Sequence, residues 1–443
     1  MRKTQYVDLV EDIAGKIEGG AFPPGFRLPT HRRFAEEKGV AVATASRVYK
    51  ELQERGLIVG ERGRGVFVRD PGLSRMLGIE QTAPEGLIDL VCNIPREKSD
   101  PEILRKGLQY LISRGDLDAL LQYQPHSGRP HERAIFADHL ETRLGRFEPD
   151  RLLITSGIQH SLTVAVMGAL KHGDLIGTDE QTYPGFKSIS ALRGCRLTAV
   201  AGNNGSMDIA ALEALCRKSK PRALYLMPTV HNPIGSVMDE VVRHQLIECA
   251  DRHDLLLIED SAYSFLEPDA PPNLVSLAPH RTIHVGGFSK SFATGLRVGY
   301  IVCPTHLVER LGHVIRATTW NTPALNTALI SHWIEDGTLS KVEEHRRADG
   351  ARRQKICQEV LQGMDIVAHP NASVAWLPLP NGVRSEPIAK GLNDAGIAVS
   401  SGEPFNVSDT AQHALRLAFG GFQEGTLRSV FEEIRLHISR ACS

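Results

Sequence analysis

The chain has 443 residues, of which 42% are hydrophobic and 23% charged, and its formal net charge is -1. These proportions are close to those of average globular proteins, so they argue against wholesale disorder and against a membrane protein. The length exceeds what one hydrophobic core usually organises, which predicts two or three domains.

The near-neutral total hides an uneven distribution of charge. Residues 1–69 contain 13 Lys/Arg and 9 Asp/Glu, a net charge of +4, which leaves -5 for the rest of the chain. The basic N-terminal part is therefore the candidate for binding a polyanion.

Apolar runs and cysteines indicate the compartment. No run approaches the roughly 18 consecutive apolar residues of a membrane helix. Asp8, Glu11 and Asp12 interrupt the N-terminal segment, where a secretory signal would be apolar. We therefore expect a cytoplasmic protein with no membrane partner. The seven cysteines are scattered, which favours reduced thiols and predicts no metal site.

Residues 1–69 carry the pattern of three helices and a β-hairpin. Apolar residues recur with helical period in QYVDLVEDIAGKIEGG (5–20), which predicts a helix that ends at its paired glycines. The turn FPPGFRLPT follows, and Thr30 can cap a second short helix that ends at Gly39. A third helix over 42–56 and two short strands within 57–68 complete a winged helix-turn-helix.

This segment resembles the head of GntR-type bacterial regulators. The family's pattern is matched by PGFRLP, by Arg32 three residues later and by the wing GRGVFV, although Val42 stands where the family often has an arginine. The resemblance implies that the helix beginning at Val42 enters the major groove of double-stranded operator DNA. One such arginine alone would usually be a solvated surface charge, but the ordered combination favours DNA binding. The expected DNA contacts are Arg32, Thr44, Ser46, Arg47, Arg62 and Arg64.

The remainder is expected to be a linker over 70–88 and one larger domain over 89–443. Within the larger domain, helical patterns alternate with compact apolar runs, namely RLLI, ALYLMP, LLLIED and TIHVGG. This alternation predicts an α/β domain with a mainly parallel sheet covered by helices on both faces. Polar residues follow each of the four runs. Since ligands bind beyond the carboxyl ends of such strands, the sequence predicts a site at that edge.

The residues at this edge match the needs of pyridoxal phosphate. That cofactor needs a lysine amine, a carboxylate for its pyridine nitrogen, and cations and N–H groups for its phosphate. Lys290, Asp260, Arg297 and the turn at Gly157 supply this set.

Three further residues have candidate contacts to the cofactor ring. Asn232 and Tyr263 could hydrogen-bond its phenolic oxygen, and Tyr183 offers a flat face for stacking. Taken singly, each tyrosine would more often be core packing, so the functional interpretation depends on the whole set.

From about 89 to 443 the chain resembles fold-type I aminotransferases, a fold with a large sheet and a smaller C-terminal α/β part. The motifs YQPHSG, TSGIQHSL, TYPG, HNPIG, EDSAY, SK(x)6R and LRLAF occur in the family's order. The resemblance implies that Lys290 binds the cofactor, that Tyr123 reaches the cofactor of a partner subunit, and that Arg416 binds the α-carboxylate of an amino acid. It also implies a phosphate site made of Gly157, Ile158, Gln159, Ser289 and Arg297.

A GntR-type head joined to an aminotransferase-like domain resembles the MocR subfamily of transcription regulators. The resemblance implies a homodimer, often head-to-tail, that senses an amino acid or amine when the ligand forms an external aldimine in place of Lys290. A second hypothesis is a true aminotransferase with an accessory DNA-binding head. A third is a DNA-binding protein whose large domain has lost the cofactor and only dimerises, against which the complete set of ligands argues.

Overall fold

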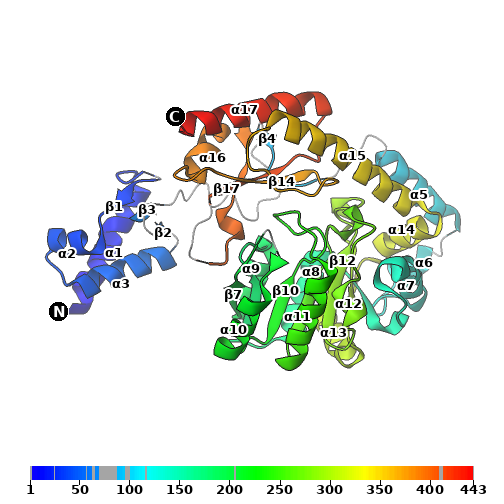
Figure 1. Ribbon diagram of the computed structural model, residues 1–443. Helices are drawn as coiled ribbons and strands as arrows, with labels where there is room; N and C mark the ends of the chain where they lie inside the picture. The colour runs from blue at the N-terminus through cyan, green and yellow to red at the C-terminus, as the bar shows by residue number, and fades with distance from the viewer. Residues whose placement is uncertain are drawn as a thin grey trace.

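The computed structural model describes residues 2–23, 25–55, 57–61, 65–68, 87–94, 100–114, 117–203, 206–408 and 413–442. Figure 1 shows three groups of elements: the N-terminal head in blue, a large domain in green and yellow, and a smaller layer in orange and red.

The head is the predicted winged helix-turn-helix. Thr30 accepts a hydrogen bond from the backbone N–H of Arg33 and Gly39 ends the same helix in the left-handed region, so both predicted helix boundaries are observed. The segment predicted only as a turn also contributes a short strand, which pairs antiparallel with the second strand of the wing. The elements are α1 (Arg2–Glu18), β1 (Arg27–Leu28), α2 (His31–Lys38), α3 (Val42–Glu54), β2 (Ile58–Glu61) and β3 (Gly65–Val68).

The large domain is built on a seven-stranded sheet of order β5-β13-β12-β11-β10-β6-β7. All neighbouring pairs are parallel except those of β13, which runs antiparallel to both β12 and β5. The strands are β5 (Leu152–Thr155), β6 (Leu175–Asp179), β7 (Arg196–Val200), β10 (Ala223–Leu226), β11 (Leu256–Asp260), β12 (Thr282–Gly287) and β13 (Gly299–Val302).

Helices cover both faces of this sheet, as alternate residues of β11 demonstrate. Ile258 packs in a core with Leu162 and Leu311, whereas Leu257 packs in another core with Leu212 and Leu246. Successive side chains of a strand point to opposite faces, so the apolar run of this strand serves two cores at once. The covering helices are α8 (Ile158–Ala169), α9 (Pro184–Arg193), α10 (Ile209–Ser219), α11 (Glu240–Arg252), α12 (Leu274–Leu277) and α13 (Thr305–Thr318).

The smaller layer holds a three-stranded antiparallel sheet of order β14-β17-β16. Its core includes Leu415 and Leu417 of the central strand and Phe431 of the C-terminal helix. The elements are β14 (Val374–Pro378), α16 (Ser385–Asp394), β15 (Ile397–Ala398), β16 (Ser400–Ser401), β17 (Ala414–Ala418) and α17 (Glu424–Cys442).

A short strand, β4 (Ile88–Asp89), pairs in parallel with β15 of the smaller layer. It begins at the last residue of the expected linker, one residue before the expected start of the large domain, and most of the linker lies outside the described residues. The other elements are α5 (Asp100–Arg114), α6 (Leu117–Leu121), α7 (Pro130–Leu144), β8 (Gly202–Asn203), β9 (Ser206–Met207), α14 (Ala324–Glu335) and α15 (Thr338–Val360). None of the helices in the described part of the chain combines the length and the apolar character that crossing a bilayer requires.

Candidate functional site

The polar residues predicted from the strand ends lie at one edge of the large sheet. Asp260 is the last residue of β11, and Lys290 lies three residues beyond β12. Because β13 is antiparallel, its first residue, Gly299, is paired with Gly287 at the end of β12. Arg297 therefore comes to the same edge although it precedes a strand.

A glycine turn and a guanidinium form the first part of the site. Gly157 is the N-cap of α8 with φ 88° and ψ 165°, a conformation that side-chain-bearing residues rarely adopt. A Cβ at this position would lie 2.8 Å from a terminal nitrogen of Arg297, and Arg297 donates to the Ser289 hydroxyl at 3.4 Å. Ile158 and Gln159 form the first turn of α8, whose free N–H groups and positive end suit an anion.

Tyr183 lies beside this turn. Its hydroxyl donates a hydrogen bond to Oε1 of Gln159 at 3.0 Å. Burial raises the pKa of Tyr183 to about 12, and the nearby Asp260 and Tyr263 act in the same direction. The phenol is therefore neutral and acts as a hydrogen-bond donor.

Asp260 is a buried carboxyl group with two donors. Its side chain receives the Tyr225 hydroxyl at 2.7 Å and the backbone N–H of Ala262 at 3.0 Å. Burial raises the pKa of Asp260 above its ordinary value, while these two hydrogen bonds act to lower it. Tyr225 is absent from the sequence prediction because it lies inside the apolar run ALYLMP, where an aromatic residue is typical of a buried strand.

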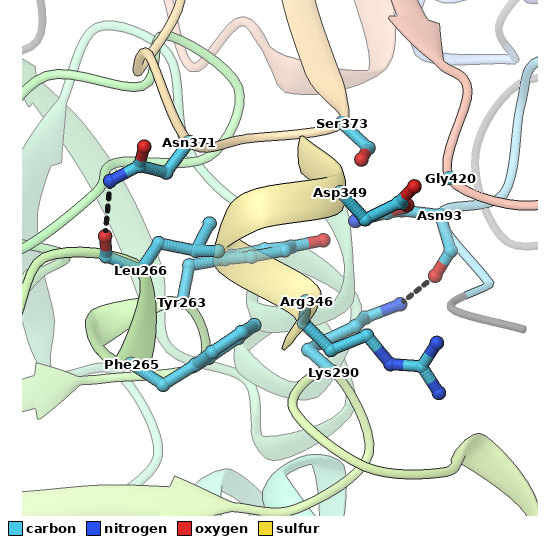
Figure 2. A pocket seen from close by; sticks show the side chains of 10 residues that line it. All are labelled: Asn93, Tyr263, Phe265, Leu266, Lys290, Arg346, Asp349, Asn371, Ser373 and Gly420. Atoms are coloured by element: carbon cyan, nitrogen blue, oxygen red, sulfur yellow. Dashed lines mark hydrogen bonds between the residues drawn. The ribbon is translucent and has the colours of Figure 1, made fainter. Parts of the chain in front are cut away.

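Lys290 lies in a pocket beside Tyr263 (Figure 2). Its Nζ donates to the backbone carbonyl of Asn93 at 2.8 Å. Burial alone would raise the pKa of Tyr263, but the positive charges of Lys290 and Arg416, with a hydrogen bond to Asn93, lower it below its usual value. The pocket is lined by Asn93, Tyr263, Phe265, Leu266, Lys290, Arg346, Asp349, Asn371, Ser373 and Gly420.

Sequence reasoning found only Lys290 and Tyr263 among these lining residues. Arg346 and Asp349 lie on α15 in HRRADG, a sequence typical of an exposed helix, yet they are 7% and 6% exposed. Two carboxylate oxygens of Asp100 accept hydrogen bonds from Arg346. Arg346 and Asp349 can be distinguished from surface charges only in the folded structure, where α15 packs against the pocket.

Arg416 and Asn232 meet at the boundary between the two sheets. Arg416 is 6% exposed on β17, and its Nε donates to Oδ1 of Asn232 at 3.1 Å. A terminal nitrogen donates to the carbonyl of Val91 at 2.9 Å. The guanidinium is thus held among oxygen acceptors close to the pocket.

Tyr123 is the one predicted cofactor residue that lies apart from this group. It is 84% exposed, and its ring lies 5.4 Å from that of Trp320. Arg316 is 5.3 Å from the same indole ring. These residues form an exposed aromatic patch with a cation beside it.

The predicted DNA contacts in the head differ in their surroundings. Arg32 is exposed, whereas Arg47 lies 4.4 Å from the ring of Tyr6 on α1. Ser46 is hydrogen-bonded to His31 at 3.1 Å, and Thr44 is half-buried. Arg62 and Arg64, predicted for the wing, lie outside the described residues.

The donor set of the large domain fits pyridoxal phosphate. The turn at Gly157 leaves room that a Cβ would fill, and it lies against a guanidinium and a helix N-terminus, as a phosphate requires. Asp260 is a buried carboxyl group suited to a pyridine nitrogen, and Lys290 supplies the amine within a pocket.

Comparisons with known families agree with this geometry. The family of aminotransferases of class I and II matches residues 85–434. The gntR family of bacterial regulatory proteins matches residues 5–68.

Individual relatives include both regulators and an enzyme. An uncharacterised HTH-type transcriptional regulator of Bacillus subtilis, YdeF, is 28% identical, covering 93% of this chain and 90% of its own. The probable rhizopine catabolism regulatory protein MocR of Rhizobium meliloti is 25% identical over 79% of this chain and 75% of its own. A 2-aminoadipate transaminase of Thermus thermophilus is 27% identical, covering 79% and 91%.

Among solved structures, the kynurenine aminotransferase of Pyrococcus horikoshii matches with a TM-score of 0.76 and 23% identity. The match covers 81% of this chain and 92% of that enzyme. It shows that the large and small sheets have the aminotransferase fold.

Proposed function

The chain belongs to the aminotransferase class I and II family and, with its gntR-type head, to the MocR subfamily of transcription regulators, and on this premise we propose that it controls DNA binding by sensing an amino acid or amine. The head binds DNA and the family's cofactor is pyridoxal phosphate. What we add is the role of the site as a sensor and the roles of its residues.

The observation that carries the proposal is the position of the segment that leaves the head. Residues 89–94 follow the proposed linker, and this segment contacts the site twice. Val91 accepts a hydrogen bond from Arg416, and Asn93 accepts one from Lys290. A ligand that engages either side chain therefore competes with contacts to the segment that leads to the DNA-binding head. Ligand binding can bias the head only through such differential contacts.

We assign the cofactor's contacts from the geometry at the strand ends. Gly157, Ile158, Gln159, Ser289 and Arg297 hold the phosphate. Asp260 would hold the pyridine nitrogen, and the hydrogen bond from Tyr225 favours its carboxylate form against the effect of burial. Tyr183, Asn232 and Tyr263 contact the ring. When bound, pyridoxal phosphate supplies an aldehyde that reacts with amines and a ring that withdraws electrons.

The ligand is a small amine, and Arg416 favours one with a carboxylate. Its guanidinium is oriented by Asn232 and Val91, so it is preorganised to bind a carboxylate by two parallel hydrogen bonds. Lys290 would hold the cofactor through its side-chain amine, and the ligand would bring a second amine to the same pocket. Tyr263 lies beside the lysine amine, and the positive charges of Lys290 and Arg416 lower its pKa against the effect of burial.

The proposed assembly is a cytoplasmic head-to-tail homodimer on operator DNA. Tyr123, 84% exposed beside Trp320, would reach the cofactor of the partner subunit. The proposed domains are 1–69, a linker over 70–88, and 89–443. In the head, Arg32 and Arg47 contact DNA together with Thr44 and Ser46, and the wing residues Arg62 and Arg64 complete the set.

A second candidate function is transamination. The hydrogen bond between Arg416 and Asn232 and that between Tyr225 and Asp260 orient a guanidinium and a carboxyl group, which an active aminotransferase would also need. Under this alternative, the head is accessory.

One titration separates the two functions. The visible spectrum of the full-length protein with its cofactor is recorded while amino acids and amines are added singly without a keto acid, and DNA binding is followed in parallel by fluorescence anisotropy. A ligand that shifts the spectrum lastingly and also changes the affinity for DNA would support the sensor. Conversion of the cofactor to its amine form, reversed by a keto acid and without effect on DNA affinity, would establish the transaminase instead.

A further inference from the structure

A cluster of two thiols and an imidazole lies far from the cofactor site, between α10 and α11. Cys216 on α10 and Cys249 on α11 are 2% and 0% exposed, and His253 immediately follows α11. One potential ligand atom from each residue lies within 4.8 Å of the other two. The helices pack side by side against the large sheet (Figure 1).

The fold creates this cluster from residues that are distant in sequence. Cys249 and His253 are four residues apart, which places them on the same side of a helical turn. Cys216 comes from the neighbouring helix, 33 residues earlier in the numbering. Separation of this kind explains why the scattered cysteines predict no metal site when the sequence is considered alone.

A carboxylate orients the imidazole. Nε2 of His253 lies 2.9 Å from Oε2 of Glu213, which is also on α10. When Nε2 donates to this carboxylate, Nδ1 is the ring nitrogen with a lone pair available for a cation. A metal-binding histidine that donates its other N–H to a carboxylate is a common arrangement at zinc sites.

The electrostatics of the position favour a cation. Cys216 and Cys249 both lie within the last four residues of their helices, where the helix dipole places partial negative charge. Two thiolates neutralise a divalent cation, so the buried core of the complex would carry no net charge. Arg252, which donates to Glu213 at 3.0 Å, balances the carboxylate.

We propose that Cys216, Cys249 and His253 form a binding site for a thiophilic divalent cation of the zinc class, with Glu213 orienting the histidine. Two thiolates and an imidazole are ligands that zinc prefers, and water completes its four-coordinate shell. Binding displaces the two thiol protons to solvent. The bound ion joins α10 to α11 at the end of the sheet opposite the cofactor site.

The test uses full-length protein carrying its cofactor. After dialysis against a chelator, zinc is added in competition with a chromophoric chelator, and cobalt is used in parallel as a spectroscopic probe. We expect one tightly bound zinc per chain and a thiolate-to-cobalt charge-transfer band. Surface histidines binding alone would give no such band.

Three variants locate the site. His253→Ala removes a ligand and should weaken zinc binding by more than about 100-fold, whereas Glu213→Gln, which keeps all three ligands, should weaken it by about 10- to 100-fold. His244→Ala is the matched control, because His244 lies on α11 but outside the cluster. The zinc affinity of this variant should equal that of the wild type. The cofactor's visible absorbance verifies folding in each variant.

Two results would overturn the proposal. One is an absence of tight zinc binding, or zinc binding that Glu213→Gln and His253→Ala leave unchanged. The other is isolation of the metal-free protein with Cys216 and Cys249 joined in a disulfide that forms equally in the presence of zinc.

Discussion

Nε of Arg416 donates to Oδ1 of Asn232 at 3.1 Å, so the central strand of the small sheet is joined to the loop after β10 of the large sheet. The same guanidinium holds the carbonyl of Val91, just beyond the head's linker. One arginine therefore contacts both sheets and the segment that leads to the DNA-binding head, which makes it the first residue to test.

Arg416→Ala should keep the cofactor but lose the response to carboxylate-bearing amines. Charge-assisted hydrogen bonds contribute about 1.5–3 kcal/mol each, so losing two of them should raise the ligand concentration for half-maximal spectral change by about 100-fold or more. The visible spectrum during ligand titration measures this. Arg435→Ala on an exposed position of α17 is the control, and an equal response in both variants would exclude a carboxylate clamp at Arg416.

Lys290→Ala should abolish the covalent attachment of the cofactor. Its amine is the one that lines the pocket, beside Tyr263. The purified variant should lack the visible band of the lysine-bound cofactor, while Lys171→Ala, at an exposed position, should retain it. Persistence of the band in Lys290→Ala with no added amine would contradict the assignment.

Gly157→Ala should weaken cofactor binding because its methyl group would fill the space beside Arg297. Gly173→Ala serves as a control for the backbone strain alone. A Cβ at Gly157 would meet the Arg297 guanidinium at 2.8 Å, whereas Gly173, with a nearly equal φ of 87°, has open space around it. Both substitutions should cost about 1–3 kcal/mol of backbone strain, but only Gly157→Ala should raise the dissociation constant of the cofactor in an absorbance titration. Equal cofactor affinity in the two variants would remove Gly157 from the phosphate site.

Arg32→Ala should weaken DNA binding at every sequence and reduce its dependence on salt. Loss of one phosphate contact lowers the slope of log affinity against log salt by about 1. Arg33→Ala is the neighbouring control, because Nε of Arg33 is paired with Glu37 at 2.9 Å. Fluorescence anisotropy at several salt concentrations measures both slopes, and parallel lines for Arg32→Ala and the wild type would argue against a phosphate contact.

His160 should make the folded state sensitive to mild acid. Burial lowers the pKa of His160 from 6.5 to about 4. Between these values the unfolded chain binds more protons at this residue, so its contribution to stability is present above pH 6.5 and is lost as the pH falls toward 4. The loss is on the order of 2 kcal/mol after allowance for partial exposure. Urea unfolding measures the free energy of unfolding at pH 7 and pH 5. This free energy should fall less between the two pH values for His160→Gln than for the wild type, and an equal fall in both proteins would refute the lowered pKa of His160.

The sequence predicted most of the architecture because its signals are local. The cap at Thr30, the left-handed Gly39 and the apolar runs of the large sheet each determine a short segment without help from the rest of the chain. The exception in the head is β1, a two-residue strand whose pairing with β3 is a tertiary contact.

The order of motifs in the sequence predicts which residues come together at one edge of the sheet. Lys290, Asp260 and Gly157 follow strands of one sheet, and Arg297 precedes its antiparallel strand β13, so topology alone brings all four to one edge. The pocket walls could not be predicted in this way, because Arg346 on α15 and Asn93 after the linker reach the site only through packing between the two sheets. The role of Tyr225 as a hydrogen-bond donor could not be predicted either, because it depends on the pairing of β10 with β11, which brings the hydroxyl to Asp260.

That strand pairing has a consequence for the chemistry of the site. In the parallel register of β10 and β11, Tyr225 lies opposite Ile258, and the Tyr225 hydroxyl reaches the carboxylate two residues further along. A slip of one residue would turn Tyr225 toward the other face of the sheet. The hydrogen bond that counteracts the effect of burial on the pKa of Asp260 therefore depends on the same alignment that builds two hydrophobic cores, so a shift of this register would disrupt the site and the core packing together.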